Sequence, residues 1–362
     1  MKSFLRQNGA WLGFLVLSII LSIWTGGDFL SPRNLTNLIR QASLNGILAA
    51  GMTVIILTGG IDLSIGSLVA LCGVVVGLSQ VNLGYGSSGQ AGLWMSAGLA
   101  LLVGLGLGLI NGILIATLRL APFVITLGMM VIARGLAMIF SGGSSISPMG
   151  ESLNDLASGY FSENFSLVFL ALLFIVSLYF LWKNRSSFKD FLFPFLAFIL
   201  FSQSFIRYKG FPFLALFLFA AVGITWLLLN RTVLGRNIYA IGSNEKGAYW
   251  AGVSIRQVKI TAYALMGLLS GLAAFLLSGR LNGSDPNAGQ LFELDAIAAV
   301  VIGGVSLKGG SGSVMGSLIG ALTMATLNNG MDLLGISSFY QMVFKGIIII
   351  LAVSLDRSQR EA

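Results

Sequence analysis

The sequence has no histidine and a single cysteine, and only 9% of its 362 residues are charged. The absence of histidine excludes the Ser-His-Asp triad, other imidazole-based acid–base pairs and the usual imidazole metal sites. Cys72 has no second cysteine to pair with, so no disulfide can form within the chain. No G-x-x-x-x-G-K-[ST] segment occurs, and the chain therefore has no P-loop. These absences argue against an enzyme and predict that energy comes from ATP on a partner or from an ion gradient.

The sequence consists largely of long hydrophobic segments. It is 56% hydrophobic with a mean hydropathy of +0.90, whereas soluble domains are about a quarter charged. Runs of roughly 17–25 apolar residues can cross a ~30 Å hydrocarbon core as helices. We therefore predict an all-α polytopic membrane protein, one transmembrane domain over residues 1–362, with ten to twelve transmembrane helices. The expected spans lie near 10–26, 35–58, 64–82, 91–117, 121–140, 165–182, 190–206, 211–229, 259–279, 291–306, 312–331 and 336–355. The segment 291–306 is short enough to be a broken or re-entrant helix.

The basic residues predict the orientation. With the N-terminus inside, most Lys and Arg residues of the connecting loops fall on the cytoplasmic side, as the positive-inside rule requires. Both termini are then cytoplasmic. The net charge of +8 follows from this topology, so it predicts no nucleic-acid partner. The external loops are expected to carry Asp28, Glu151, Asp155, Glu163, Asp285, Glu293, Asp295 and Asp332.

Glycine is abundant and recurs at four-residue intervals. This spacing aligns glycines on one helix face, where helices can approach closely in lipid, so we expect tight helix packing there. A second pattern is a weak internal similarity between Thr58–Ser67 and Ile302–Gly310, as two halves with a shared unit would show. The similarity is too short to decide whether a duplication occurred. The regularly spaced residues are Gly104, Gly108 and Gly112, then Gly267 and Gly271, then Gly312, Gly316 and Gly320.

Polar groups at membrane depth are candidates for function, because a charge there is costly. Amides that both donate and accept hydrogen bonds also suit sugar hydroxyls. Each has a structural alternative: Asp62 would cap a helix starting at Leu63, Arg134 would pair with a carboxylate or with backbone carbonyls, and the amides would hold helices together. The candidates for a translocation path or gate are Asn45, Asp62, Asn111, Arg134, Glu293, Asp295, Asn328 and Asn329.

The segment 230–258 is the longest polar stretch on the predicted cytoplasmic side. We interpret Thr232–Gly235 as the end of a span and Arg236–Ile241 as a connector. Gly242–Gly252 is predicted to be a turn, a short helix capped by Ser243 or Asn244, and a glycine stop. Such a helix could lie in the interface with its aromatic residues as anchors. The length of the polar connector favours a helix that docks on a separate protein.

Four segments resemble a known family. They are GMTVIILTGGIDLSIGSLVAL (51–71), LGRNIYAIGSNEKGAYWAG (234–252), ELDAIAAVVIGGVSLKGGSGSVMGSLIGAL (293–322) and FYQMVFKGIIIILAVSLD (339–356). They resemble the permease subunits of bacterial ABC importers for monosaccharides, the ribose/xylose/arabinose/galactoside group. Within that group, an extra helix pair within 165–229, Tyr208–Pro212 and Ser145–Met149 look most like the D-xylose permease.

The resemblance implies a permease that translocates a monosaccharide, D-xylose or another pentose, across the bacterial inner membrane. It implies a homodimer in membrane lipid, two cytoplasmic ATP-binding subunits that hold the ATP and Mg, and a periplasmic sugar-binding protein; this chain would bind no cofactor. The alternative is an ion-coupled secondary sugar transporter, against which the lack of a series of intramembrane acids argues. By the same resemblance, the ATPase-coupling residues are Gly242, Ser243, Asn244, Glu245, Lys246, Ala248 and Gly252.

Overall fold

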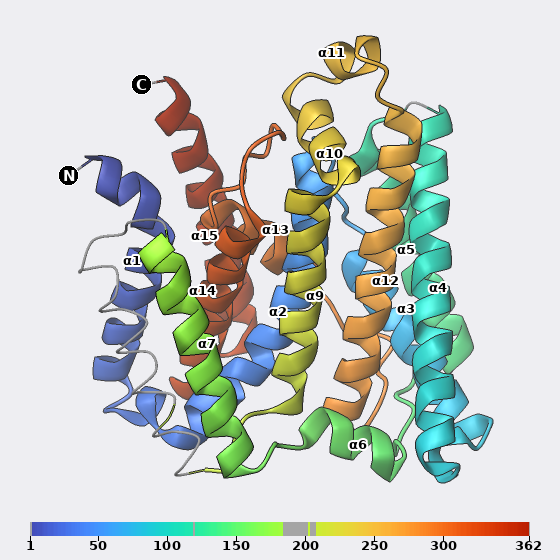
Figure 1. Ribbon diagram of the computed structural model, residues 1–362. Helices are drawn as coiled ribbons and strands as arrows, with labels where there is room; N and C mark the ends of the chain where they lie inside the picture. Colours follow the sequence, from blue (N-terminus) through green and yellow to red (C-terminus); the bar gives the residue numbers. More distant parts are fainter. Residues whose placement is uncertain (1, 119, 184–201, 203–207, 362) are drawn as a thin grey trace.

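The computed structural model describes residues 2–118, 120–183, 202 and 208–361, and within them the chain is helical. Figure 1 shows helices running mainly up and down the molecule. In chain order the elements are α1 (Lys2–Trp24), η1 (Asp28–Leu30), α2 (Pro32–Leu57), α3 (Ile65–Gly77), η2 (Leu78–Asn82), η3 (Tyr85–Ser87), α4 (Gly89–Leu118), α5 (Pro122–Ser141), α6 (Glu151–Ser158), α7 (Glu163–Lys183), α9 (Phe213–Arg231), α10 (Val233–Ser243), α11 (Glu245–Trp250), α12 (Ile255–Leu281), α13 (Phe292–Ile302), α14 (Val314–Leu333) and α15 (Ser338–Glu361).

Six helices in the described part are long and apolar enough to cross a membrane. They are α2, α3 with its continuation to Asn82, α4, α5, α9 and α12. Shorter apolar stretches lie at Ala10–Trp24, Glu163–Leu172 and Ser338–Ile350. The expected span 190–206 falls, except for residue 202, outside the described residues. The expected span 291–306 is the 11-residue α13, which at 1.5 Å per residue is about 16 Å long and cannot cross a ~30 Å core.

The two ends of the bundle differ. Both termini, α10 and α11 lie at one end, which we call the basic end, and α6 lies at the other, which we call the acidic end (Figure 1). This confirms that the termini and the segment 230–258 share one side. Asp295, expected in an external loop, is instead 4% exposed within the first turn of α13. The expectation was wrong for Glu293 as well, because α13 begins at Phe292 and both acidic residues lie in its first turn.

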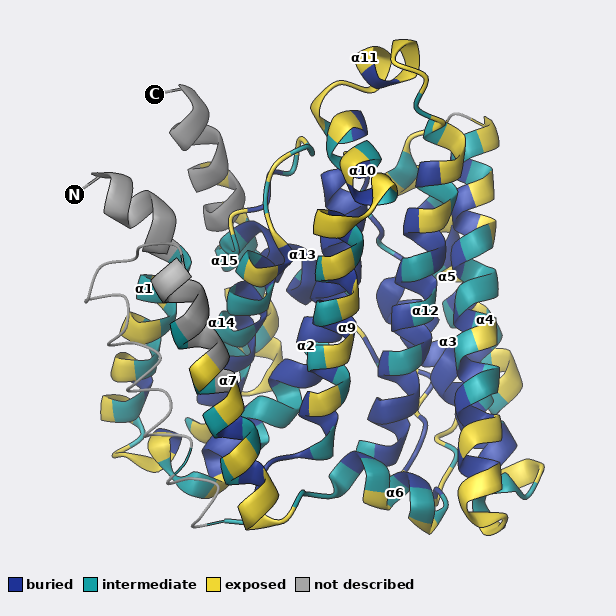
Figure 2. Cartoon of the chain, in the orientation of Figure 1, coloured by how far each residue is buried: buried dark blue, intermediate teal, exposed yellow. Residues whose placement is uncertain are grey.

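The spaced glycines pack helices closely, as predicted. A Cβ atom added at Gly104 or Gly108 on α4 would overlap the backbone of α12, and one at Gly267 on α12 would overlap α4. Gly316 and Gly320 bring α14 against α13 in the same way. Buried residues concentrate on α2, α3 and α12, at the centre of the bundle (Figure 2).

Two helices in the expected extra pair meet through aromatic rings. The ring of Phe169 on α7 lies 5.0 Å from that of Phe211 and 5.9 Å from that of Phe219, which is on α9. The backbone N–H of Phe211 donates a 2.8 Å hydrogen bond to Ser166 Oγ. These contacts join α7 to α9 across the segment that separates them in sequence.

The chain is not helical between the expected spans 35–58 and 64–82. Helix α2 ends at Leu57 and α3 begins at Ile65, with Gly59 at a φ of +78° between them. A left-handed φ of this size is unstrained for glycine and unfavourable for other residues. The backbone between the helices is therefore free to line a polar site.

Candidate functional site

The segment 230–258 folds into two consecutive helices at the basic end. Thr232 caps α10 by accepting the Gly235 N–H at 3.2 Å, and Asn244 caps α11 by accepting the Gly247 N–H at 2.9 Å. Of the two predicted caps, Asn244 is the one used. The predicted connector Arg236–Ile241 is wrong, since these residues are helical. The Thr232 cap starts that helix, and its Ile238 side chain is 0% exposed.

Helix α11 is largely exposed (Figure 2). Trp250 is 87% exposed and Tyr249 is 68% exposed, which is unusual for large aromatic side chains. Ala248 packs inward at 5% exposure, and the helix stops at Gly252, whose φ is +83°. Lys259 Nζ on α12 bonds Glu245 Oε1 at 2.9 Å. A short, capped helix is thus held away from the bundle with two aromatic rings uncovered.

The other predicted coupling residues divide between surface and bundle. Ser243, Asn244, Glu245 and Lys246 are exposed, whereas Gly242 is half-buried. A cleft of about 310 Å³ lies beside them. Its walls are Thr58–Gly60 after α2, Ile241–Glu245, Pro122, Lys259, Tyr263 and Lys308.

Asp62 is buried in the break between α2 and α3. Its Oδ1 accepts the Ser64 N–H at 2.8 Å and the Ser64 Oγ–H at 2.6 Å. Asn111 Nδ2 on α4 donates to Ser64 Oγ at 3.0 Å, and Asn111 Oδ1 has no hydrogen-bond partner in the described part of the chain. The alternative role as a cap for a helix starting at Leu63 is wrong, since α3 begins at Ile65 and Asp62 bonds the residue before it.

Arg134 binds backbone carbonyls, one of the two partners that its position predicted. Its Nη1 donates to Pro286 O at 2.6 Å and to Ala288 O at 2.9 Å. This places one guanidinium nitrogen on the loop that leads into α13. Glu293 Oε2, at the start of α13, lies where a Cβ on Gly66 of α3 would overlap it. Arg134 therefore connects α5 to the loop before α13, and Glu293 brings the start of α13 against α3.

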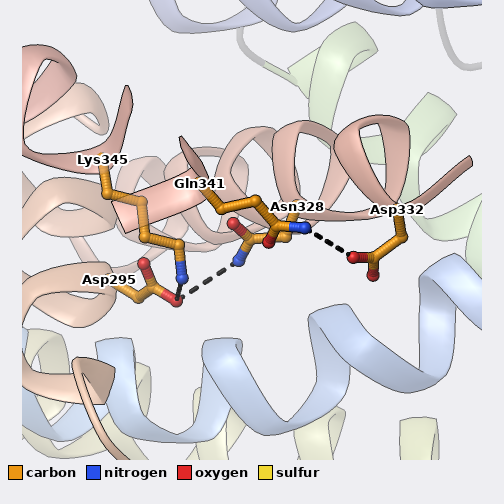
Figure 3. Close-up of polar contacts among 5 residues, drawn as sticks. All are labelled: Asp295, Asn328, Asp332, Gln341 and Lys345. Carbon is orange, nitrogen blue, oxygen red and sulfur yellow. Dashed lines mark hydrogen bonds and ion pairs between the residues drawn. The ribbon is translucent and has the colours of Figure 1, made fainter. Parts of the chain in front are cut away.

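Asp295 on α13 is the centre of a polar cluster formed by three helices (Figure 3). Its Oδ2 binds Lys345 Nζ of α15 at 2.9 Å and accepts from Asn328 Nδ2 of α14 at 3.3 Å. Asp295 Oδ1 and Asn328 Oδ1 are buried without a hydrogen-bond partner among the described residues. Farther along, Gln341 Nε2 donates to Asp332 Oδ1 at 2.9 Å. The cluster fixes α13 against α14 and α15.

Two predicted amides lie elsewhere. Asn329 and Asn34 form a reciprocal amide pair, with N–O distances of 2.8 and 2.9 Å, that joins α14 to α2. Asn45 is half-buried on α2. The eight path candidates therefore do not form one site. Asp62 and Asn111 are linked through Ser64, Asp295 and Asn328 belong to one cluster, and Arg134, Glu293, Asn45 and Asn329 lie separately from these.

Sequence reasoning missed three functional candidates. Lys345 lies within the expected span 336–355, and an intramembrane lysine signals a buried carboxylate partner. Tyr239 donates its hydroxyl to Gly312 O at 3.0 Å, and Tyr263 O–H reaches Ile61 O at 3.4 Å. Neither tyrosine has a distinguishing local pattern. No group of three His, Cys, Asp or Glu side chains suited to a metal ion occurs within the residues described.

Known proteins match the chain along nearly its whole length. A family model described as "Branched-chain amino acid transport system / permease component" matches residues 34–353. The ribose import permease protein RbsC of Bacillus subtilis (strain 168) is 40% identical over 98% of this chain and 94% of its own length. RbsC of Escherichia coli (strain K12) is 36% identical over 99% and 96%, respectively.

A relative named for xylose matches as well. The xylose transport system permease protein XylH of Escherichia coli (strain K12) is 33% identical over 99% of this chain and 94% of its own length. Its identity is lower than that of the two ribose permeases. No solved structure matches the chain.

Proposed function

The chain belongs to the family of branched-chain amino acid transport system / permease components, and from that premise we propose that it is the membrane permease of an ATP-driven importer of monosaccharides. The family makes it a multi-span membrane subunit of a bacterial ABC importer that is not itself catalytic, with ATP bound by a partner subunit. It also implies an ATP-binding subunit and a binding protein as partners.

The observation that carries the proposal is α11. It is a capped helix at the end where the basic residues predict the cytoplasm, with Trp250 and Tyr249 uncovered. Exposed aromatic rings beside charged residues are typical of a protein interface. We propose that Ser243–Lys246 and the two rings enter a groove on the ATP-binding subunit, while inward-facing Ala248 and the Glu245–Lys259 ion pair position the helix.

The substrate class follows from the relatives. Proteins named for ribose and for xylose match at similar coverage, and both sugars are pentoses. The xylose resemblance of the segment 165–229 and the higher identity to ribose permeases point to different pentoses, so we propose a pentose without choosing between them. Branched-chain amino acids, named in the family description, are the competing substrates to exclude.

In the proposed assembly two copies of this chain form the permease, with two ATP-binding subunits on the basic end and a periplasmic sugar-binding protein on the acidic end. ATP binding by the partners displaces α11 and switches the path between its two sides. A ligand can shift such an equilibrium only through differential contacts with the two states. Asp62 and Asn111 are the proposed path residues near the cytoplasmic cleft, because Asn111 Oδ1 is left as an acceptor for a hydroxyl.

The test begins with purification of the chain from its native host in detergent and identification of the proteins that accompany it. We expect an ATP-binding subunit and the sugar-binding protein. Uptake of radiolabelled ribose, xylose and leucine is then measured in proteoliposomes with the reconstituted complex. ATP-dependent pentose uptake supports the proposal. Leucine uptake would show that branched-chain amino acids, and not pentoses, are the substrates. Sugar uptake by the chain alone, if an ionophore abolishes it, would support an ion-coupled carrier.

A further inference from the structure

Three backbone segments, distant in sequence, meet at the basic end through direct backbone contacts. They are Leu57–Gly59 at the end of α2, Gly309–Gly310 in the loop after α13, and Gly242–Ser243 at the end of α10. We call this contact the glycine junction. The Gly310 N–H donates to Leu57 O at 3.0 Å. A Cβ on Gly309 would lie 2.9 Å from both Gly242 Cα and Gly59 N, so the three segments are in direct contact.

Gly242 occupies the centre of the junction. A Cβ at this position would overlap Leu57 O and Gly310 N and would lie 3.0 Å from the carbonyl carbon of Gly309. These neighbours are backbone atoms, which cannot move aside as the end of a flexible side chain can. Any larger residue at 242 must therefore shift α10 or the two loops.

A second contact ties α10 to the same loop. Tyr239 donates its hydroxyl to Gly312 O at 3.0 Å. Burial raises the pKa of Tyr239, so the phenol remains protonated and the donor persists over the physiological range. Tyr239 and Gly242 lie three residues apart, almost one turn of helix, and so act from one face of α10.

Each of the two loops joins consecutive helices of the bundle. Residues 58–64 separate α2 from α3 and contain Asp62, and residues 303–313 separate the short α13 from α14. They are also the segments that share the weak internal similarity. The end of α10 thus contacts both loops, and α10 continues directly into the exposed α11.

We propose that the glycine junction is the transmission contact of this permease, through which displacement of α10 and α11 moves the 58–64 break and the 303–313 loop together. The inference rests on the proposed function, because α11 is displaced only if a partner ATPase binds it. Close-packed backbone transmits such a displacement because it has little capacity to deform.

The test is Gly242→Ala in the reconstituted complex with its ATP-binding subunit and binding protein. Alanine is the better helix former, so a loss cannot come from helix propensity. We expect the sugar imported per ATP hydrolysed to fall about tenfold or more, because an overpacked methyl group shifts a two-state equilibrium by that order. Gly223→Ala on α9 is the matched control, since no atom lies within 4 Å of its added Cβ; it should import as wild type does.

Tyr239→Phe keeps the proposal testable if Gly242→Ala does not assemble. It removes one hydroxyl without adding volume, and we expect normal co-purification of the ATPase with a reduced ratio of sugar imported to ATP hydrolysed. If both variants assemble and retain the wild-type ratio, the junction does not transmit motion and the proposal fails. If the wild-type complex shows no ATP-driven uptake, it is instead the proposed function that fails.

Discussion

Removal of Lys345 should destabilise the protein more than removal of almost any other basic side chain. Lys345 Nζ lies 2.9 Å from Asp295 Oδ2, with side chains 14% and 5% exposed, respectively. At an effective dielectric of 20 the attraction over that distance is about 6 kcal/mol. Desolvation of both groups offsets much of it, so the intact pair contributes little net stability.

The single substitution Lys345→Met is expected to cost more stability than the intact ion pair contributes. Asp295 would keep only the Asn328 amide at 3.3 Å, and its Oδ1 already has no hydrogen-bond partner among the described residues. Breaking one side of a buried pair typically costs about 3–5 kcal/mol, whereas replacing both charges by apolar groups is often neutral. We therefore expect Lys345→Met to lower the free energy of unfolding by about 4 kcal/mol and Asp295→Leu/Lys345→Met to recover most of the loss.

The assay is thermal unfolding of the purified variants in one detergent, followed by tryptophan fluorescence. Lys209→Met, at an exposed lysine, is the control and should unfold with wild type. A Lys345→Met protein as stable as the control would refute the reasoning, because Asp295 would then need no counter-charge. If Asp295→Leu/Lys345→Met is less stable than Lys345→Met, the expectation that two apolar residues can replace the ion pair is wrong.

Trp250→Ser should leave thermal stability unchanged, because the side chain is 87% exposed, and should weaken co-purification of the ATPase; unchanged co-purification would count against docking through α11. Glu245→Lys reverses one side of the Glu245–Lys259 pair and should reduce uptake at normal expression, as measured by radiolabelled sugar. Arg134→Met removes two hydrogen bonds to Pro286 and Ala288, and with about 1.5–3 kcal/mol for each charged donor it should lower the unfolding temperature; an unchanged melt would mean that the loop before α13 needs no anchor. Gly104→Leu inserts a side chain where α4 contacts the α12 backbone, and over-packing of more than about 3 kcal/mol should abolish folded protein in size-exclusion chromatography.

Local patterns predicted the parts of the site that depend on neighbours in sequence. The Asn244 cap, the short helix after it and the Gly252 stop follow from capping and backbone preferences over a few residues. The local errors were the connector at Arg236–Ile241, the span end at Thr232–Gly235, which is instead the cap and first turn of α10, and the Asp62 cap. Thr232 is a good N-cap residue, so the start of α10 could have been predicted from the sequence. The polar residues of this segment made it resemble a loop, although α10 has buried positions.

Four of the eight path candidates, Asp62, Asn111, Asp295 and Asn329, are buried polar groups, and the eight lie in several parts of the bundle; their role in a path stays a prediction. Asp295 finds its counter-charge fifty positions later, at Lys345, and Asn329 finds Asn34 across nearly the whole chain. The number of possible partners for one buried charge is large, and only the packing of helices selects among them. The contacts of Gly242 could not be predicted for the same reason, since no neighbouring residue distinguishes it from other glycines near helix ends.

The sequence alone determined the membrane class, the shared side of both termini, the capped helix Glu245–Trp250 and the glycine faces that pack. Each depends on hydropathy, charge or backbone preference over at most one or two helices, which are properties of a segment. Only the tertiary structure decided that α13 is fixed through Asp295 and Lys345, and that Leu57, Gly242 and Gly310 meet at one point. These depend on contacts between segments as far apart in sequence as Leu57 and Gly310, which form only when the helices pack and which no local pattern encodes.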